Sequence, residues 1–181
     1  LQTTYMGLKL KSPVIAASSG LTRSIENLIE IEKQGAGAVV LKSLFEEQLL
    51  AEANKNLTEL HDEYGYPEAY DYITNFTKSN SVNEYLELIT EAKSKLSIPI
   101  IASINCYSDS EWIDYAKRFE EAGADALELN IYLIPTDPSK KGEVIEDIYV
   151  DIVKTVKKSV NIPLAVKLNP FFSSLANFSA K

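Results

Sequence analysis

Two lysines stand in apolar, strand-like runs of the sequence. Lys167 lies within Leu164-Ala-Val-Lys-Leu-Asn-Pro170, and Lys42 lies near the end of Ala38-Val-Val-Leu-Lys-Ser43. A parallel strand that is covered on both faces is normally a continuous run of Val, Ile and Leu. An ammonium group there is costly unless an anionic or polar group meets it. The two lysines therefore predict a site that holds negative charge.

The segments that must position these lysines alternate between strand-like and helix-like patterns. The predicted strands are 14–17, 38–42, 99–105, 126–132 and 164–169, and the predicted helices are 24–34, 81–96, 108–122 and 144–160. Ser81-x-x-Glu84 and Ser108-x-x-Glu111 are capping boxes, which predict the starts of two of these helices. Strict alternation of this kind predicts βαβ units and a parallel sheet.

Internal repeats refine the predicted α/β fold. Ile98 to Asn105 matches Ile162 to Asn169, and Gly35-Ala-Gly-Ala38 matches Gly123-Ala-Asp-Ala126. Such repeats favour a (β/α)8 TIM barrel, which needs eight strands and about 250 residues. The 181 residues supply about five strands. We therefore expect an incomplete barrel in which 1–181 is the N-terminal portion of one domain, either a fragment, which is the favoured interpretation, or completed by another chain.

Composition and charge narrow the class of protein. The net charge of −8 argues against a nucleic-acid partner. No apolar run approaches the roughly 20 residues that span a membrane. The single cysteine, Cys106, excludes an internal disulfide and favours a reducing, cytoplasmic location, and a small buried thiol is the favoured interpretation. The one histidine, His61, has no partners for a metal site, so no metal is expected. The long connection 44–80 is predicted to be a lid over the site, or else to pack a small helix of its own.

Several motifs recur in a familiar order. They are Met6-Gly-Leu-Lys-Leu-Lys-Ser-Pro13 with Ala16-Ala-Ser-Ser-Gly20, then Gly35 to Ser43, Tyr64-Gly-Tyr-Pro67, Asn130 at the end of the fourth strand, and Val166-Lys-Leu-Asn-Pro170. This order resembles the N-terminal half of the dihydroorotate dehydrogenase family of FMN-dependent barrel enzymes. The resemblance covers nearly the whole chain, from Tyr5 to about Pro170.

The resemblance implies an FMN-dependent oxidoreductase that acts on a CH–CH bond, in pyrimidine biosynthesis or on a related small, pyrimidine-like substrate. It implies a soluble homodimer. The flavin would be held by Ala17, Ser18, Ser19, Gly20, Lys42, Ser43, Asn105, Asn130 and Lys167, and the substrate by Lys42, Tyr64, Gly65 and Asn130. Lys167 would stabilise the negative charge of the reduced flavin. Because the strands that would hold the flavin phosphate are absent, we expect this chain alone to bind FMN poorly and to be inactive.

The sequence departs from the family pattern at the catalytic base. Family members that oxidise dihydroorotate use Cys or Ser in the loop after the fourth strand, where this chain has Leu133 or Ile134. Tyr132, Thr136 or Asp137 would have to substitute; with Lys42, Tyr132 and Thr136 form the predicted catalytic set. Acids also replace the two asparagines that flank the family's substrate loop, at Asp62 and Glu68. We therefore expect a divergent member with another substrate or direction.

Two other functions fit the same residues. A flavin- or nucleotide-binding barrel without turnover would explain the missing base. A Schiff-base aldolase would use Lys167 as its nucleophile, and would need burial or a neighbouring cation to depress the lysine pKa. Structural roles are also open: Lys167 pairing with Glu128, Lys42 reaching solvent, and Asn105, Asn130 and Asn169 capping the strand ends.

Overall fold

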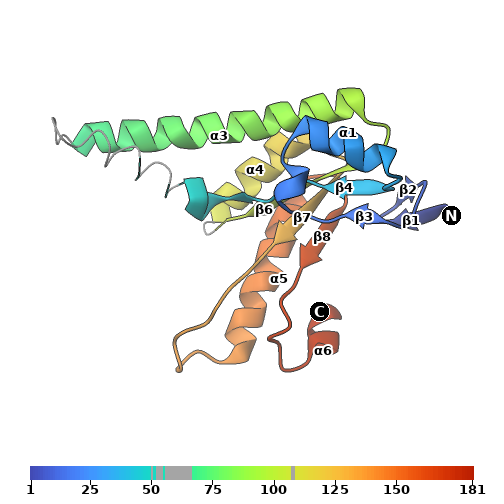
Figure 1. The fold of residues 1–181 in the computed structure, drawn as a ribbon. Coiled ribbons are helices and arrows are strands. Elements are labelled where there is room, and N and C mark those ends of the chain that lie inside the picture. The colour runs from blue at the N-terminus through green and yellow to red at the C-terminus, as the bar shows by residue number, and fades with distance from the viewer. Residues whose placement is uncertain (50, 52–54, 56–66, 107–108) are drawn as a thin grey trace.

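A curled parallel sheet forms the centre of the computed structural model, which describes residues 1–49, 51, 55, 67–106 and 109–181 (Figure 1). Its strands are β3 (Ile15–Ala16), β4 (Ala38–Val40), β6 (Ile100–Asn105), β7 (Ala126–Asn130) and β8 (Leu164–Lys167), which lie side by side in that order. All four pairings are parallel. A short strand, β5 (Leu44–Phe45), also pairs with β6. The five predicted strands and the incomplete barrel are confirmed.

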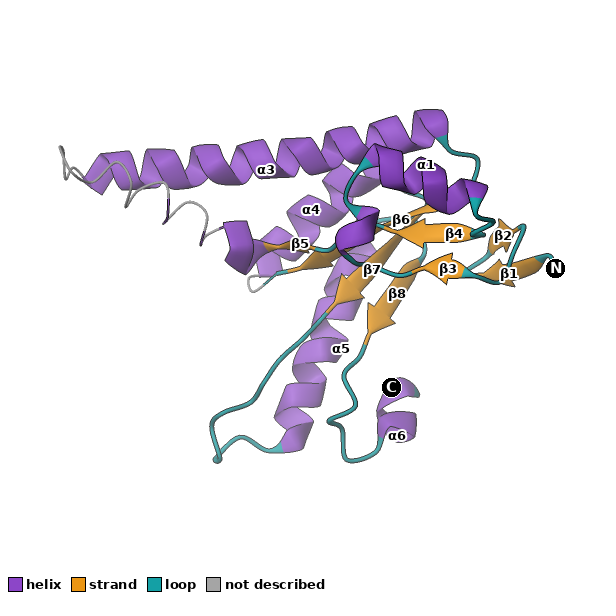
Figure 2. Ribbon diagram, in the orientation of Figure 1, coloured by secondary structure: helices purple, strands orange, loops and turns teal. Residues whose placement is uncertain are grey.

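Helices cover one face of this sheet, as Figure 2 shows. They are α1 (Ile25–Lys33), α3 (Pro67–Lys95), α4 (Asp109–Glu121) and α5 (Gly142–Ser159), followed by the short α6 (Leu175–Ser179). Alternate strand residues, such as Ile104 and Leu129, join buried helix residues such as Trp112 and Phe119 in the main hydrophobic core. This face corresponds to the outside of a barrel.

A hairpin covers the start of the opposite, inner face. It consists of β1 (Thr3–Tyr5) and β2 (Leu8–Leu10), joined at Met6 and Gly7, whose φ angles of 51° and 80° are the left-handed values of a tight hairpin turn. Leu10, Ala38, Val40, Ile101 and Ala126 form a second, smaller core there. The sequence did not predict this hairpin, which closes the inner face at the amino ends of the strands.

The helix predictions hold except at one start. α1, α4 and α5 begin and end within two residues of their predicted bounds. However, α3 begins at Pro67 rather than at Ser81, so the Ser81-x-x-Glu84 capping box was the wrong helix start, and Ser81 lies in the middle of a 29-residue helix. Ser108, the other predicted cap, lies outside the described residues. Of the predicted lid 44–80, residues 67–80 belong to α3, and residues 56–66 lie outside the described residues.

A β-bulge follows β4 and changes where its residues point. Val40 pairs with Ile101 and Leu44 pairs with Ile104, so four steps along one strand match three along the other. Bulges of this kind redirect side chains and occur often beside active sites. The predicted strand 38–42 was therefore too long. Val40 is the last paired residue of β4, Leu41 still donates its N–H to the Ile101 carbonyl at 2.9 Å, and pairing resumes at Leu44.

Tyr85 of α3 fills the gap that the bulge leaves in the ladder. The backbone N–H of Ser103 donates to the Tyr85 hydroxyl at 3.0 Å, and that hydroxyl donates to the Ser103 carbonyl at 3.2 Å. The Tyr85 ring is buried and lies 4.7 Å from the ring of Phe119. A side chain thus satisfies two buried backbone groups that β4 would otherwise have met.

The repeated sequences correspond to repeated structure at the amino ends of the strands. Gly35 and Gly123 follow α1 and α4 with φ of 94° and 97°, the left-handed conformation expected of glycine after a helix. Three residues before each glycine, a glutamate accepts from the loop before a strand: Glu32 from the Ser97 N–H at 2.9 Å, and Glu120 from the Asn161 N–H at 2.8 Å. The predicted helix ends are confirmed.

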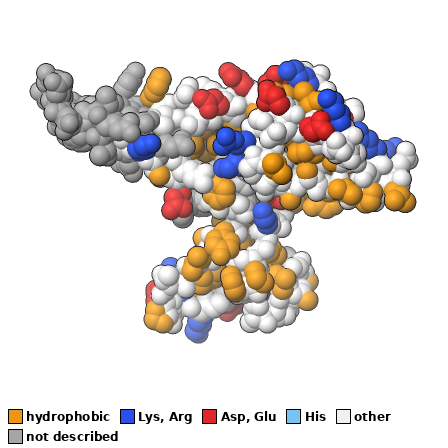
Figure 3. Space-filling model, in the orientation of Figure 1, with side chains coloured by type: hydrophobic (Ala, Val, Ile, Leu, Met, Phe, Trp, Pro, Cys, Tyr) orange, Lys and Arg blue, Asp and Glu red, His pale blue; other side chains and the backbone are white. Residues whose placement is uncertain are grey.

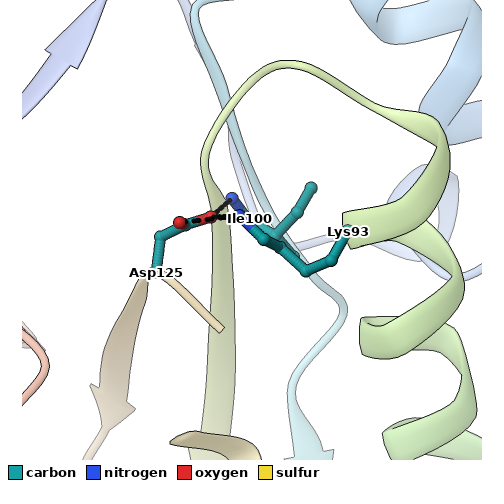
Figure 4. A network of polar contacts seen from close by, with 3 residues as sticks. All are labelled: Lys93, Ile100 and Asp125. Carbon is teal, nitrogen blue, oxygen red and sulfur yellow. Dashed lines mark hydrogen bonds and ion pairs between the residues drawn. The ribbon is translucent and has the colours of Figure 1, made fainter. Parts of the chain in front are cut away.

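An ion pair fastens the start of β7 to the end of α3 (Figure 4). The Asp125 carboxylate accepts from the Lys93 ammonium at 2.7 Å and from the backbone N–H of Ile100, also at 2.7 Å. Three elements therefore meet at one side chain.

None of the helices in the described residues is both apolar and long enough to span a membrane.

Candidate functional site

A cavity of about 750 Å³ opens at the carboxyl ends of β6 and β7. Asn105 and Asn130, the last residues of those two strands, line it together with Tyr132 and Thr136 from the following loop. Active sites of barrel enzymes lie at this end of the strands. The structure therefore brings together four of the predicted site residues.

The two asparagines are fixed by hydrogen bonds behind the cavity. The Asn105 side-chain amide donates to the backbone carbonyl of Asn130 at 2.6 Å. The Asn130 amide donates to the Ser43 hydroxyl at 3.3 Å. Both asparagines are partly buried, so these bonds hold them in place while leaving them accessible from the cavity.

Ser43 belongs to a row of polar side chains beneath the cavity. Its hydroxyl lies 2.6 Å from the Ser103 hydroxyl, which donates to Glu128 at 2.9 Å. Ser18 accepts from the Ser43 backbone N–H at 2.9 Å, and its hydroxyl lies 3.2 Å from the Ser43 hydroxyl. Two predicted flavin contacts, Ser18 and Ser43, thus lie next to each other because the bulge turns Ser43 toward Ser18.

Lys42 lies apart from the asparagines. It lines a separate cavity of about 250 Å³ with Arg23, Gln48 and Tyr85. Its ammonium group donates to the Gln48 side chain at 3.4 Å and stands 5.8 Å from the centre of the Phe45 ring. The bulge accounts for this position, because it brings Ser43 rather than Lys42 to the side chains of Ser103 and Asn130.

Lys167 stands beside Asn130 on the neighbouring strand. The two residues are directly paired in the register of β7 and β8. The Lys167 side chain is exposed, and no ion pair with Glu128 joins these two described residues. A Schiff-base lysine relies on burial or on a neighbouring cation. The Lys167 side chain is not buried. Its position suits a cation that faces the inner side of the sheet.

The segment after β3 forms a turn. Ser19 caps a short 3-10 helix, Gly20–Thr22, by accepting from the Leu21 N–H at 3.3 Å. Ala17, Ser19 and Gly20 are exposed, and Ser18 is partly buried. Of these four predicted flavin contacts, only Ser18 is hydrogen-bonded to the row of polar side chains, through Ser43. Tyr64 and Gly65, the predicted substrate contacts, lie outside the described residues.

The loop after β7 offers three groups in place of the missing base. Tyr132, Thr136 and Asp137 all line the larger cavity, as do Leu133 and Ile134. Hydrogen bonds from the Ser139 hydroxyl and backbone N–H lower the pKa of Asp137. A carboxylate so stabilised is a weaker base, which leaves Tyr132 and Thr136 as the better candidates.

Tyr149 holds the loops of the site together, and the sequence did not mark it. It is buried in α5, and its hydroxyl accepts from the Leu133 N–H at 3.2 Å and from the Asn169 amide at 3.3 Å. The side-chain oxygen of Asn169, Oδ1, accepts from the Phe171 N–H at 2.9 Å. Asn169 is therefore a loop cap.

Ser103 and Glu128 are further residues that sequence analysis missed as part of the site. Both are polar residues inside apolar strands, the same signal that drew attention to the lysines. The sequence suggested Glu128 only as an ion-pair partner of Lys167.

Cys106 follows Asn105 but takes no part in the cavity. Its side chain is buried, as predicted. Burial, and then the nearby Glu46 and Glu111 carboxylates, raise its pKa well above the ordinary value of a thiol. Because the thiolate is the reactive form, Cys106 is a structural residue. No cluster of metal-binding side chains occurs among the described residues.

The family model for dihydroorotate dehydrogenase matches residues 1–180. The chain belongs to the dihydroorotate dehydrogenase family. It is 31% identical to the dihydroorotate dehydrogenase B (NAD+) catalytic subunit of Thermoplasma volcanium, over 97% of this chain and 56% of that protein. It is 32% identical to the corresponding subunit of Methanocaldococcus jannaschii, over 94% and 54%.

The chain thus spans about half the length of the curated relatives that it matches. Among solved structures, it is similar to a dihydrodipicolinate synthase from Bacillus anthracis, with 15% identity, a TM-score of 0.49, and coverage of 84% of this chain and 44% of that one.

Proposed function

We propose that this chain forms the first half of the catalytic barrel of an FMN-dependent oxidoreductase that acts on the CH–CH bond of dihydroorotate or a related pyrimidine-like ring. One observation carries the proposal. In a member of this family, a single cavity is lined by Asn105 and Asn130, the end residues of two adjacent strands, and by Tyr132 and Thr136, whose side chains carry hydroxyl groups.

The cavity fits the ring of a flavin better than its phosphate. Its volume of about 750 Å³ lies within the usual range for sites of drug-sized ligands. The asparagines offer polar contacts to a ring edge, and Lys167 adds a positive charge on the neighbouring strand. The phosphate would sit in loops after the last strands of a complete barrel, which this chain does not supply. When bound, FMN would supply the hydride acceptor.

The residues of this chain would have three tasks. Asn105 and Asn130 would hold the ring edge, and Lys167 would offset negative charge near it. Tyr132 or Thr136 would take the proton that leaves the substrate carbon. The relatives are named as NAD+ enzymes, and we propose NAD+ as the final electron acceptor. A homodimer remains a prediction, which sedimentation velocity would check.

Rapid mixing of the oxidised protein, at its natural length, with dihydroorotate under anaerobic conditions tests the base. Tyr132→Phe and Thr136→Val each remove one hydroxyl. The variant that lacks the base should reduce its flavin roughly 10²–10⁴-fold more slowly. Asp137→Asn is the control, because Asp137 is engaged by Ser139. Unchanged reduction in both hydroxyl variants would exclude both groups as the base.

A further inference from the structure

Four polar side chains form a continuous row beneath the cavity, from β3 to β7. They are Ser18, Ser43, Ser103 and Glu128. Ser43 is 4% exposed and Ser103 is not exposed at all. Water therefore has little access to the middle of the row, so that the side chains must satisfy one another.

The hydrogen bonds in this row can run in only one direction. A serine hydroxyl has one hydrogen to donate. Ser103 donates its hydrogen to Glu128, so its oxygen must accept from Ser43. Ser43 then has no hydrogen left, and its oxygen can only accept, from the Ser18 hydroxyl at 3.2 Å and the Asn130 amide at 3.3 Å.

This direction fixes the orientation of the Asn130 side chain. Its Nδ2 must face Ser43, which leaves Oδ1 with no partner in the described part of the chain. Asn105 is fixed in the same way, because its Nδ2 faces a backbone carbonyl, which can only accept. Both asparagines line the larger cavity, so each keeps a free acceptor oxygen at the site.

We propose that Glu128, acting through Ser103 and Ser43, is a positioning residue that keeps Asn130 oriented with its Oδ1 free, so that the site takes the N–H edge of a flat nitrogen heterocycle. Such an edge occurs in imides and ureides. The orientation of Asn130 follows from the hydrogen bonds alone, whereas the identity of the ligand rests on the proposed flavin function.

The chemical group at position 128 decides in which direction the hydrogen bonds of the row run. An ionised carboxylate only accepts, whereas the amide of Gln both donates and accepts. In Glu128→Gln the new amide can donate to Ser103, which frees the row to reverse and lets Asn130 turn over. This substitution conserves shape while it removes the charge and the fixed hydrogen-bond direction, so it separates positioning from packing.

The test is hydrogen exchange of the asparagine side-chain amides, measured by NMR on the isotope-labelled chain. Glu128→Gln and Ser103→Ala should each speed exchange of the Asn130 amide by about 5–10-fold, the effect of losing one hydrogen bond. Asn105 is the control within the same spectrum, because its bond to a backbone carbonyl does not pass through the row. Glu121→Gln, on the exposed surface of α4, is the control substitution.

An Asn130 exchange rate that stays the same in both variants would overturn the positioning role. An equal acceleration at Asn105 would also overturn it, because the variants would then be loosening the whole region. FMN titration, followed by flavin fluorescence, tests the ligand: Glu128→Gln should weaken binding several-fold, and equal affinity would contradict the N–H contact. If the unaltered protein at its natural length binds no FMN, the proposed flavin function and ligand fail, while amide exchange still decides the role of Glu128.

Discussion

Removing the hydroxyl of Tyr85 tests whether this side chain replaces the backbone hydrogen bonds that are missing beside Ser103 at the bulge. In Tyr85→Phe the ring keeps its place against Phe119, and only the two hydrogen bonds to Ser103 disappear. A buried backbone group without a partner costs about 1–3 kcal/mol. With two such groups, we expect the free energy of unfolding to fall by about 2–4 kcal/mol.

Urea denaturation at neutral pH measures this loss as a lower midpoint with an unchanged m-value. Tyr5→Phe is the control, because Tyr5 is exposed on β1 and its hydroxyl has no partner among the described residues. That variant should lie within about 0.5 kcal/mol of the unaltered protein. If Tyr85→Phe were no less stable than Tyr5→Phe, the Ser103 backbone groups would have found other partners without the Tyr85 hydroxyl. That result would refute the reasoning.

The same substitution has a predictable pH dependence. Burial, and to a smaller extent the Glu128 carboxylate, raise the pKa of Tyr85 well above that of a free phenol. The neutral phenol therefore stabilises the folded state fully below about pH 10, and this contribution is lost as the pH rises further and the unfolded chain ionises. The stability gap between Tyr85→Phe and the unaltered protein should narrow above about pH 10.

Three other substitutions or reactions test further parts of the structure. Asp125→Ala should lower the free energy of unfolding by about 1–3 kcal/mol, because it leaves the buried Ile100 N–H without a partner. Lys93→Ala should lower it by less than about 1 kcal/mol. Urea unfolding of the two variants measures both losses. Cys106 should react with a thiol reagent at pH 8 far more slowly in the folded chain than in urea, and equal rates would contradict its burial and raised pKa. Lys167→Ala in the natural-length protein should lower the flavin reduction potential, and an unchanged potential would exclude the charge-offsetting role.

The architecture was largely predictable because a parallel sheet leaves a strong pattern in sequence. Apolar runs marked every strand of the curled sheet except β5, and glycines marked the ends of α1 and α4. The β1–β2 hairpin was missed because its strands are three residues each and largely exposed. The start of α3 was missed because Ser81-x-x-Glu84 reads as a helix start although the helix already extends from Pro67.

The site was only partly predictable, because side-chain direction depends on a single extra residue. Alternation from Ala38 and Val40 would have placed Lys42 on the inner face, and the bulge gives that place to Ser43. Asn105 and Asn130 could be found from sequence because they end their strands. Tyr85 and Tyr149 could not, because their roles depend on contacts between elements far apart in the chain.

The visible absorbance spectrum of the protein at its natural length is the most direct test of a flavin site at the ends of β6 and β7. We expect the bands of an oxidised flavin as purified, release of FMN on denaturation, and bleaching of the bands when dihydroorotate or a related ring is added without oxygen. Asn130→Leu, which removes the amide at the cavity wall, should weaken FMN retention. A colourless protein that takes up no added FMN would contradict the proposed function.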